Sequence, residues 1–286
     1  LHSFPTRRSS DLFVMLLSVV ISANLCYHVK NQFICEFKTK WSCITMKKFI
    51  AEDSFWELFP EAEIGIVVLN NVDNSEQVYS ESEAIRDDLA KANEEALKWI
   101  PATPLSKNPV VGVWREAFQK FKKKKGNRAS IEALLSRVEK GNYVGGINPL
   151  VDIYNAVSLN CALPVGGEDI DHFAGDLRLT VSEEGGDSFL ALGDEENNPT
   201  LPGELCYLDD EGAVCRCWNW RDGQRTMLTN DTENAFMIIE SVDPARHNDV
   251  LKAMDAIAEN AQKYLGASVL TKSLITSGSR EVIIEK

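Results

Sequence analysis

The sequence predicts an α+β domain in which an antiparallel sheet packs against helices. Helical patterns that begin at Ser or Asn dominate the first half of the chain. Short apolar or alternating segments, separated by Gly, Asp and Asn turns, dominate most of the second half. We see no internal repeat, low-complexity linker or domain boundary after Met46. Residues 46–286 are therefore predicted to form one domain.

Residues 1–45 are predicted to be a translated leader that is not native to the protein. Residues 1–12, LHSFPTRRSSDL, resemble translated sequencing adapter, and Met46 precedes ordinary globular sequence. The alternative is a signal or anchor segment, because two arginines precede the apolar residues 12–21. That apolar run is too short to span a bilayer, and no A-x-A-like cleavage site follows it closely. We therefore expect no membrane association.

Charge and cysteine usage narrow the class of protein. The chain carries a formal net charge of −13, and the five basic and two acidic residues of 1–45 leave −16 for the remainder. Such an acidic chain is not a general nucleic-acid coat, because affinity for phosphates comes mostly from Lys and Arg. Four unevenly spaced cysteines follow Met46, which indicates a reducing, cytoplasmic location.

A local basic segment, KKKKGNR, interrupts this acidity. One interpretation is a solvated helix end, where cations suit the helix dipole. The other is a contact surface for nucleic-acid phosphates, which is compatible with weak binding by an acidic protein. The residues concerned are Lys122, Lys123, Lys124, Lys125 and Arg128.

The first half is expected to contain one strand and four helices. Residues 63–72 are a short β-branched run that ends in Asn-Asn and predict the strand. Each helix begins at a residue able to cap it and ends at Gly or Pro. The helices are predicted over 80–99, 108–126, 130–141 and from 148 to the residue before Pro164.

The helix that begins at Asn148 has the clearest pattern. Asn148 can cap it, and Pro149 fits the first helical position. At about 100° per residue, one face of this helix is polar and another is apolar. The polar face holds Asn148, Asp152 and Asn155, and the apolar face holds Leu150, Ile153 and Val157.

A glycine pair follows this helix. Gly166 and Gly167 favour a tight turn, which leads into the carboxylates Glu168, Asp169 and Asp171. A polar stripe that ends in an acidic glycine turn predicts one wall of a site. The alternative is a half-exposed helix whose polar side faces water.

The second half is expected to be a meander of antiparallel strands followed by a helix. The turn sequences at 209–212 and 221–224 are typical of hairpin loops. An amphipathic helix over 246–265 ends at Gly266, and strands over 268–276 and 281–285 finish the chain. The meander strands are predicted over 177–181, 188–193, 204–208, 213–220, 225–229 and 235–241.

The segment AVCRCWNW is the most informative of these strands. Alternation places Arg216, Trp218 and Trp220 on one face. A cation beside two indoles would make a stacking surface for a base or an aromatic side chain. The alternative is a Trp-rich core layer with a buried arginine that pairs with Glu204 or Asp152.

The sequence shows none of the standard catalytic motifs. Cys215 and Cys217, taken with Cys206, lack a known zinc spacing, and we interpret these thiols as small core residues. His172, beside Asp171, is interpreted as an exposed histidine rather than a general base. We predict no metal and no cofactor.

A set of motifs carries a family resemblance. N-P-x-V-D-x-x-N-x-V-x-L from Asn148 is followed by P-x-x-x-x-D-x-D and Gly175. Further segments in the same order are SIEALLSRVEKG, PVGGEDID, PGELCYLDDEG, CRCWNWRDGQ and T-x-N-A-F-M-I-I-E, and the whole set spans about 114–240. Together they resemble the B3/B4 domain, the tRNA-editing module of the phenylalanyl-tRNA synthetase beta subunit, in its free-standing branch.

The resemblance implies hydrolysis of the ester of a mischarged aminoacyl-tRNA in trans, without a metal or a covalent nucleophile. Aminoacyl-tRNA is then the expected partner, and the KKKKGNR segment would contact its phosphates. Whether the chain is an enzyme stays open, because the alternative is a non-catalytic module that binds an amino acid or a tRNA end. Ligase activity is not expected, because the catalytic and anticodon-reading parts of the synthetase are not matched.

Residue matching implies a substrate-binding set, whereas catalytic residues stay unassigned. Gly166 lies where the synthetase version has a histidine, which puts the synthetase's own choice of substrate in doubt. Thr232 accompanies Asn234 in the T-x-N motif. The implied substrate-binding residues are Asn148, Asp152, Asn155, Asp169, Glu204, Arg216, Trp218, Asn219 and Asn234.

Overall fold

The computed structural model describes residues 46–100 and 104–285. The predicted leader, residues 1–45, lies outside the described residues. Within the described part, no helix is long and apolar enough to cross a bilayer.

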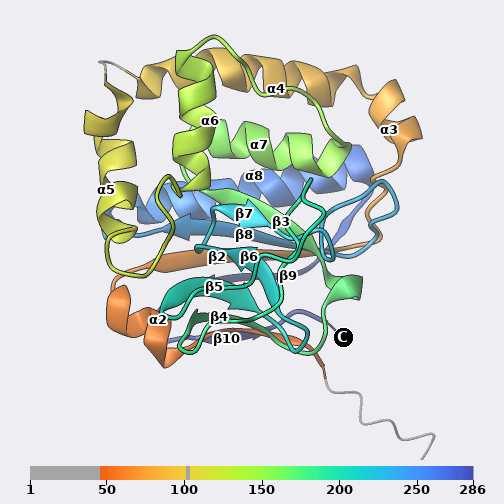
Figure 1. The fold of residues 1–286 in the computed structure, drawn as a ribbon. Coiled ribbons are helices and arrows are strands. Elements are labelled where there is room, and N and C mark those ends of the chain that lie inside the picture. The colour runs from red at the N-terminus through yellow and green to blue at the C-terminus, as the bar shows by residue number, and fades with distance from the viewer. Residues whose placement is uncertain (1–45, 101–103, 286) are drawn as a thin grey trace, which may run out of the picture. The chain divides into compact units, whose positions relative to one another are not determined.

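The strands form two sheets, and most helices lie on one side of them (Figure 1). The order is β10-β1-β4-β5-β6-β7 in the six-stranded sheet and β3-β8-β2-β9 in the four-stranded sheet. Paired strands are antiparallel except β1 and β4, so the predicted α+β fold with antiparallel pairing is confirmed. The strands are β1 (Lys48–Ala51), β2 (Glu63–Asn70), β3 (Val165–Asp169), β4 (Leu177–Ser182), β5 (Glu204–Leu208), β6 (Ala213–Arg216), β7 (Arg221–Asp222), β8 (Ala235–Ser241), β9 (Ser268–Ile275) and β10 (Glu281–Ile283).

The long helices α7 and α8 pack on the four-stranded sheet, and α4 packs on α7 (Figure 1). The α-helices of the described residues are α2 (Asp53–Leu58), α3 (Glu76–Glu81), α4 (Glu83–Glu95), α5 (Pro109–Ala117), α6 (Ser130–Glu139), α7 (Pro149–Cys161) and α8 (His247–Leu265). Short 3-10 helices occupy Ala96–Trp99, Leu105–Lys107, Ile170–His172 and Pro244–Arg246.

Strand β8 separates two hydrophobic cores. Phe236 and Ile238 pack in the core that includes residues of both sheets. Met237 and Ile239 pack in the core beneath α7 and α8. Because side chains alternate along a strand, Glu240 faces the same side as Phe236 and lies between the sheets.

Helix α7 is buried on nearly all sides. The Asn148 side chain caps it, because Oδ1 accepts from the backbone N of Val151 at 3.0 Å and Nδ2 donates to the carbonyl of Leu228 at 3.2 Å. Asp152 and Asn155 are also buried. The predicted cap is confirmed, and the alternative of a helix whose polar side faces water is wrong.

The Gly166-Gly167 pair is part of a strand and not the predicted tight turn. Strand β3 pairs with β8 along its whole length, and neither glycine has a positive φ. Packing explains Gly167, because a Cβ there would lie 2.8 Å from Sδ of Met237. Glu168 therefore sits in a paired strand, where its side chain direction is set by the sheet.

The predicted strand over 213–220 stops at Arg216. Cys217 and Trp218 have φ values of 48° and 61°, so the chain turns and the alternation does not continue. The segments 188–193 and 225–229 form no strand, because their backbone bonds go to loops and single bridges instead.

Two helix predictions also need correction. The helix predicted over 80–99 is divided at Ser82 into α3 and α4, with a short 3-10 helix after α4. Helix α5 ends at Ala117, before the lysines. The basic segment therefore lies in a loop, and its interpretation as a helix end is wrong.

Replacing Asn148 with alanine should lower the free energy of unfolding by about 1–2 kcal/mol, because α7 would no longer be capped and the carbonyl of Leu228 would have no donor. Urea denaturation measures this change. The matched control is Asn160→Ala, an exposed asparagine near the end of the same helix. Equal effects of the two substitutions would contradict the capping role.

Candidate active site

A cavity of about 90 Å³ lies between the two sheets. Part of its wall is apolar and part carries groups able to exchange protons. The apolar part includes Leu177, Val214, Phe236 and Ile238, and the polar part includes Glu168, Tyr207, Cys215, Asn219, Asp222 and Glu240.

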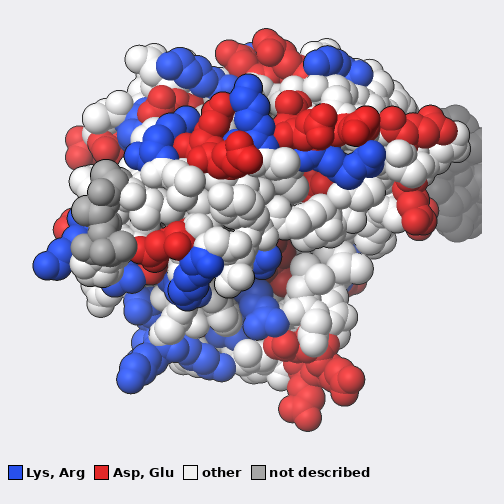
Figure 2. Space-filling model, turned by 90° about the horizontal axis from the view of Figure 1, so that it is seen from above, with Lys and Arg blue, Asp and Glu red and all other residues white. Residues whose placement is uncertain are grey.

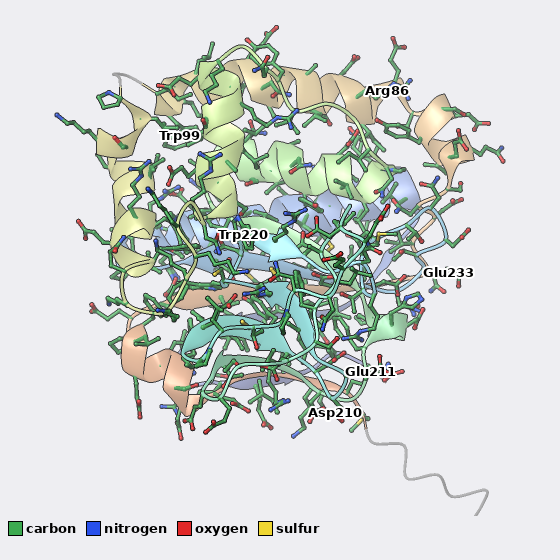
Figure 3. All side chains as sticks on the ribbon, viewed as in Figure 1. Arg86, Trp99, Asp210, Glu211, Trp220 and Glu233 are labelled. Atoms are coloured by element: carbon green, nitrogen blue, oxygen red, sulfur yellow. The ribbon has the colours of Figure 1, made fainter. Side chains whose placement is uncertain are left out.

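The open side of this cavity faces the start of α6. Tyr207, Phe236 and Glu240 are buried, whereas Asn219 and Trp220 are only half-buried. Ser130, the first residue of α6, also lines this side. Trp220 lies beside β7 in the centre of the view (Figure 3).

Glu240 is the centre of a hydrogen-bonded chain in the cavity. Its carboxylate accepts from the hydroxyl of Tyr207 and from Nδ2 of Asn219. Oδ1 of Asn219 in turn accepts from the backbone N of Ser130 at 3.2 Å. The chain therefore connects β8, β5, the turn after β6 and the start of α6.

Burial raises the pKa of Glu240 to about 7, although its hydrogen bonds with Tyr207 and Asn219 oppose the rise. A carboxyl with a pKa near 7 exchanges a proton at neutral pH, which is the requirement for a general acid or base. Tyr207 stays protonated, because burial and the Glu240 carboxylate raise its pKa well above the usual value.

Glu168 lies across the cavity on β3, and its Oε2 has no hydrogen-bond partner among the described residues. Burial and the neighbouring Asp222 carboxylate raise the pKa of Glu168 well above its usual value, although the nearby Thr226 hydroxyl and Arg225 charge oppose the rise. Burial likewise raises the pKa of Asp222, although some of its surface remains exposed. The thiol of Cys215 also has a raised pKa, through burial and the charge of Asp222. Burial in the cavity therefore raises the pKa of each of these acids.

Glu204, Arg216 and Trp218 lie behind the cavity and not on its wall. The Arg216 guanidinium makes a bidentate pair with Glu204, with Nε at 2.9 Å and Nη2 at 2.5 Å from the carboxylate oxygens. Trp218 packs against Phe55 and Trp114. The predicted exposed stacking surface does not form, and the alternative of a buried Arg paired with Glu204 is confirmed.

The pair also shapes the turn that carries Asn219. Oε1 of Glu204 accepts from the backbone N of Cys217 at 3.0 Å, where the chain has its positive φ. Asn219, two residues later, is the member of the predicted set that lines the cavity.

Asp169 and Asn234 belong to a separate cluster, where β3 ends and β8 begins. The Thr232 hydroxyl donates to Asp169 at 2.8 Å, and Nδ2 of Asn234 donates to Asp171 at 2.9 Å. His172 is exposed, with Nδ1 3.4 Å from Asp169. These contacts close a turn.

The three polar residues of α7 divide their roles. Asn148 is a helix cap. Asp152 accepts from the hydroxyl of Tyr79 at 2.7 Å and from the backbone N of Ile147 at 2.9 Å, and burial raises its pKa. The buried Asn155 side chain makes no hydrogen bond within the described part of the chain.

The basic loop, residues 122–128, ends beside the cavity. Nδ2 of Asn127 donates to Sγ of Cys217 at 3.0 Å, and Ser130, two residues after the loop, lines the cavity. Lys122, Lys124 and Arg128 are exposed. Figure 2 shows Lys and Arg side chains gathered toward the lower left of the view from above, on the side where α5 lies.

The cysteines behave as core residues, as predicted. Cys206, Cys215 and Cys217 are buried, and burial raises the pKa of Cys217 to about 12. No group of acidic, histidine or cysteine side chains in residues 46–100 and 104–285 has the arrangement of a metal site. A larger hollow of about 710 Å³ beside β1 and β4 is an open surface groove, with Arg178 near Glu52 and Arg280 near Asp53.

Sequence reasoning placed Glu168 in the acidic wall of a site, but it missed three other cavity residues: Tyr207, Asp222 and Glu240. The sequence could have indicated Glu240, because this residue is the one carboxylate at the end of the otherwise apolar segment AFMIIE. Tyr207 in ELCYL and Asp222 in a predicted hairpin loop had none, since their meeting depends on how the sheets stack.

The chain is an α+β protein of two packed sheets with an acidic internal cavity. Residues 113–266, more than half of the 286 residues, match the model of the B3/4 domain family. The chain belongs to this family.

A similar solved structure is an N-terminal fragment of the phenylalanyl-tRNA synthetase beta subunit from Pyrococcus horikoshii. The sequences are 11% identical, and the TM-score is 0.43. The match covers 77% of this chain and 49% of that chain, so this chain spans about half the length of the fragment. A search of curated proteins finds no match.

The free energy of unfolding should depend on pH through Glu240. Its pKa is raised from 4.5 to about 7, so between these values the folded protein keeps a proton that the unfolded chain releases. Stability should therefore fall as pH rises through this window, by up to about 3 kcal/mol from this residue.

Urea denaturation of the wild type and of Glu240→Gln from pH 4.5 to pH 8 isolates this effect, because the amide does not titrate. The difference in unfolding free energy, wild type minus variant, should decrease with pH. Glu259→Gln, at an exposed glutamate of α8, should give a constant difference. A constant difference for Glu240→Gln would show that Glu240 titrates normally.

Proposed function

We propose that this chain hydrolyses the ester bond of mischarged aminoacyl-tRNA in trans. The observation that carries the proposal is the position of the basic loop, which ends two residues before Ser130 on the wall of the acidic cavity. A tRNA end presents phosphates and, at its tip, an aminoacyl ester. A basic loop beside a cavity suits both parts.

Membership of the B3/4 domain family supports the proposal, together with the sequence resemblance to the editing module of a tRNA synthetase. A tRNA synthetase needs an editing site because its binding pocket distinguishes two similar small side chains only weakly. A second site that hydrolyses the wrong ester removes the error.

The chemistry assigned to Glu240 is general acid–base catalysis. The ionised carboxylate takes a proton from water as the water oxygen attacks the ester carbonyl carbon. The bond between that carbon and the ribose oxygen then breaks, and the proton returns to the ribose oxygen. Tyr207 and Asn219 hold the carboxylate in place through their hydrogen bonds.

A non-catalytic binding module is the second candidate. The observation that favours it is the neutral state of the other cavity groups, since the raised pKa values of Cys215 and Tyr207 disfavour an ionised nucleophile at neutral pH. Under this candidate the cavity binds an aminoacyl end without cleaving it.

A deacylation assay tests the catalytic proposal. The full chain is mixed with a panel of mischarged tRNAs and their correctly charged counterparts. Selective loss of one or more esters is expected, and Glu240→Gln should slow it by about 100-fold or more. Glu259→Gln should hydrolyse at the wild-type rate. Selective loss that Glu240→Gln leaves unchanged would remove Glu240 from the mechanism, and no loss with any ester would favour the binding module.

Neutralising the basic loop should weaken tRNA binding. For the triple variant Lys123→Gln, Lys125→Gln and Arg128→Gln, the slope of log K against log salt should become shallower by about 0.7–0.9 for each phosphate that the loop no longer neutralises. The control carries the same charge change at Lys91, Lys98 and Lys252, on or just after other helices. Binding isotherms at several salt concentrations measure the slopes. Equal slopes for the two variants would contradict a specific role of this loop.

A further inference from the structure

Three buried side-chain polar atoms lack a hydrogen-bond partner in the described part of the chain: Oε2 of Glu168, Nε1 of Trp218 and Oγ1 of Thr226. Of these residues, Glu168 lines the cavity, and the residue is only 6% exposed. Burying an unpaired polar atom costs free energy, and native proteins retain few of them. An orphan carboxyl oxygen in a cavity therefore indicates a group that the cavity is built to receive.

The lining of the cavity identifies the charge of that group. Asp222 and Glu240 line it with Glu168, whereas Lys, Arg and His do not contribute to its described lining. The nearby Arg225 is already held by Asp209, through contacts of 2.8 and 2.7 Å. The cavity thus offers several carboxyl acceptors and no cationic partner. A ligand that carries a positive charge and several N–H donors would satisfy them.

The cavity also has an apolar side. Leu177, Val214 and Phe236 provide a wall against which the side chain of a bound amino acid would pack.

We propose that the cavity receives the free α-ammonium group of the aminoacyl ester, and that Glu168 is the residue that holds this ammonium. This inference rests on the proposed function and names the residue that recognises the amino group of its substrate. The ammonium would donate to the orphan Oε2, and Glu168 would release its proton on binding. Esters with a blocked amino group, such as N-acetyl esters, would lack the charge and would be poor substrates.

Hydrolysis of alanyl-tRNA and N-acetylalanyl-tRNA by the full chain is the first arm of the test. The free-amino ester should react at least tenfold faster than the N-acetyl ester, and Glu168→Gln should remove most of this preference. Glutamine keeps the size of the side chain and loses its charge.

Calorimetric titration with alaninamide and N-acetylalaninamide is the second arm and needs no hydrolysis or variant. Alaninamide should bind with release of about one proton at pH 7, seen as a dependence of the binding heat on the buffer. N-acetylalaninamide should bind at least tenfold more weakly.

The two arms separate the two proposals. Equal hydrolysis of the free and blocked esters would overturn the ammonium site and leave the deacylase intact. Binding of alaninamide without hydrolysis of any ester would overturn the deacylase and leave the ammonium site intact. Hydrolysis of no ester, together with no binding of alaninamide, would overturn both.

Discussion

Burial of Glu240 between the two sheets is the constraint on which the site depends. Alternation along β8 places Phe236, Ile238 and Glu240 on the inner side, so a carboxyl group occupies a position that the two neighbours fill with apolar atoms. A buried carboxyl needs hydrogen bonds, and Tyr207 and Asn219 supply them. The same burial raises the pKa of Glu240 to about 7, so this carboxyl can take up or release a proton at neutral pH.

The buried ion pair of Glu204 and Arg216 positions Asn219, which binds the Glu240 carboxylate. Glu204 and Arg216 are both fully buried, and the pair is satisfied by further contacts to the backbone N of Cys217 and to the carbonyl of Asn198. A buried ion pair of this kind gains little net stability over apolar residues, but removal of one partner is costly. Its structural result is the left-handed turn at Cys217, which brings Asn219 onto Glu240. Glu204 and Arg216 therefore shape the wall of the cavity from behind it.

The cavity is lined by acidic residues, whereas the loop that ends beside it, residues 122–128, is basic. Glu168, Asp222 and Glu240 face the same cavity, where burial raises the pKa of each carboxyl above its usual value. Residues 122–128 carry the opposite charge and end beside the same space. A molecule with an anionic backbone and a cationic tip matches this arrangement, as the tip of an aminoacylated nucleic acid does.

The sequence by itself determined the fold class, most of the helices and the longer strands, because caps, breakers and periodicity act locally. Asn148 capping α7 and Gly266 ending α8 are examples. It also determined the motifs that match the B3/4 domain family. Only the tertiary structure decided that Trp218 is core, that Gly166 and Gly167 lie in a strand, and that Glu168, Tyr207, Asp222 and Glu240 share one cavity. The physical reason is that burial and the meeting of distant strands depend on how the two sheets stack, which local patterns along the chain do not encode.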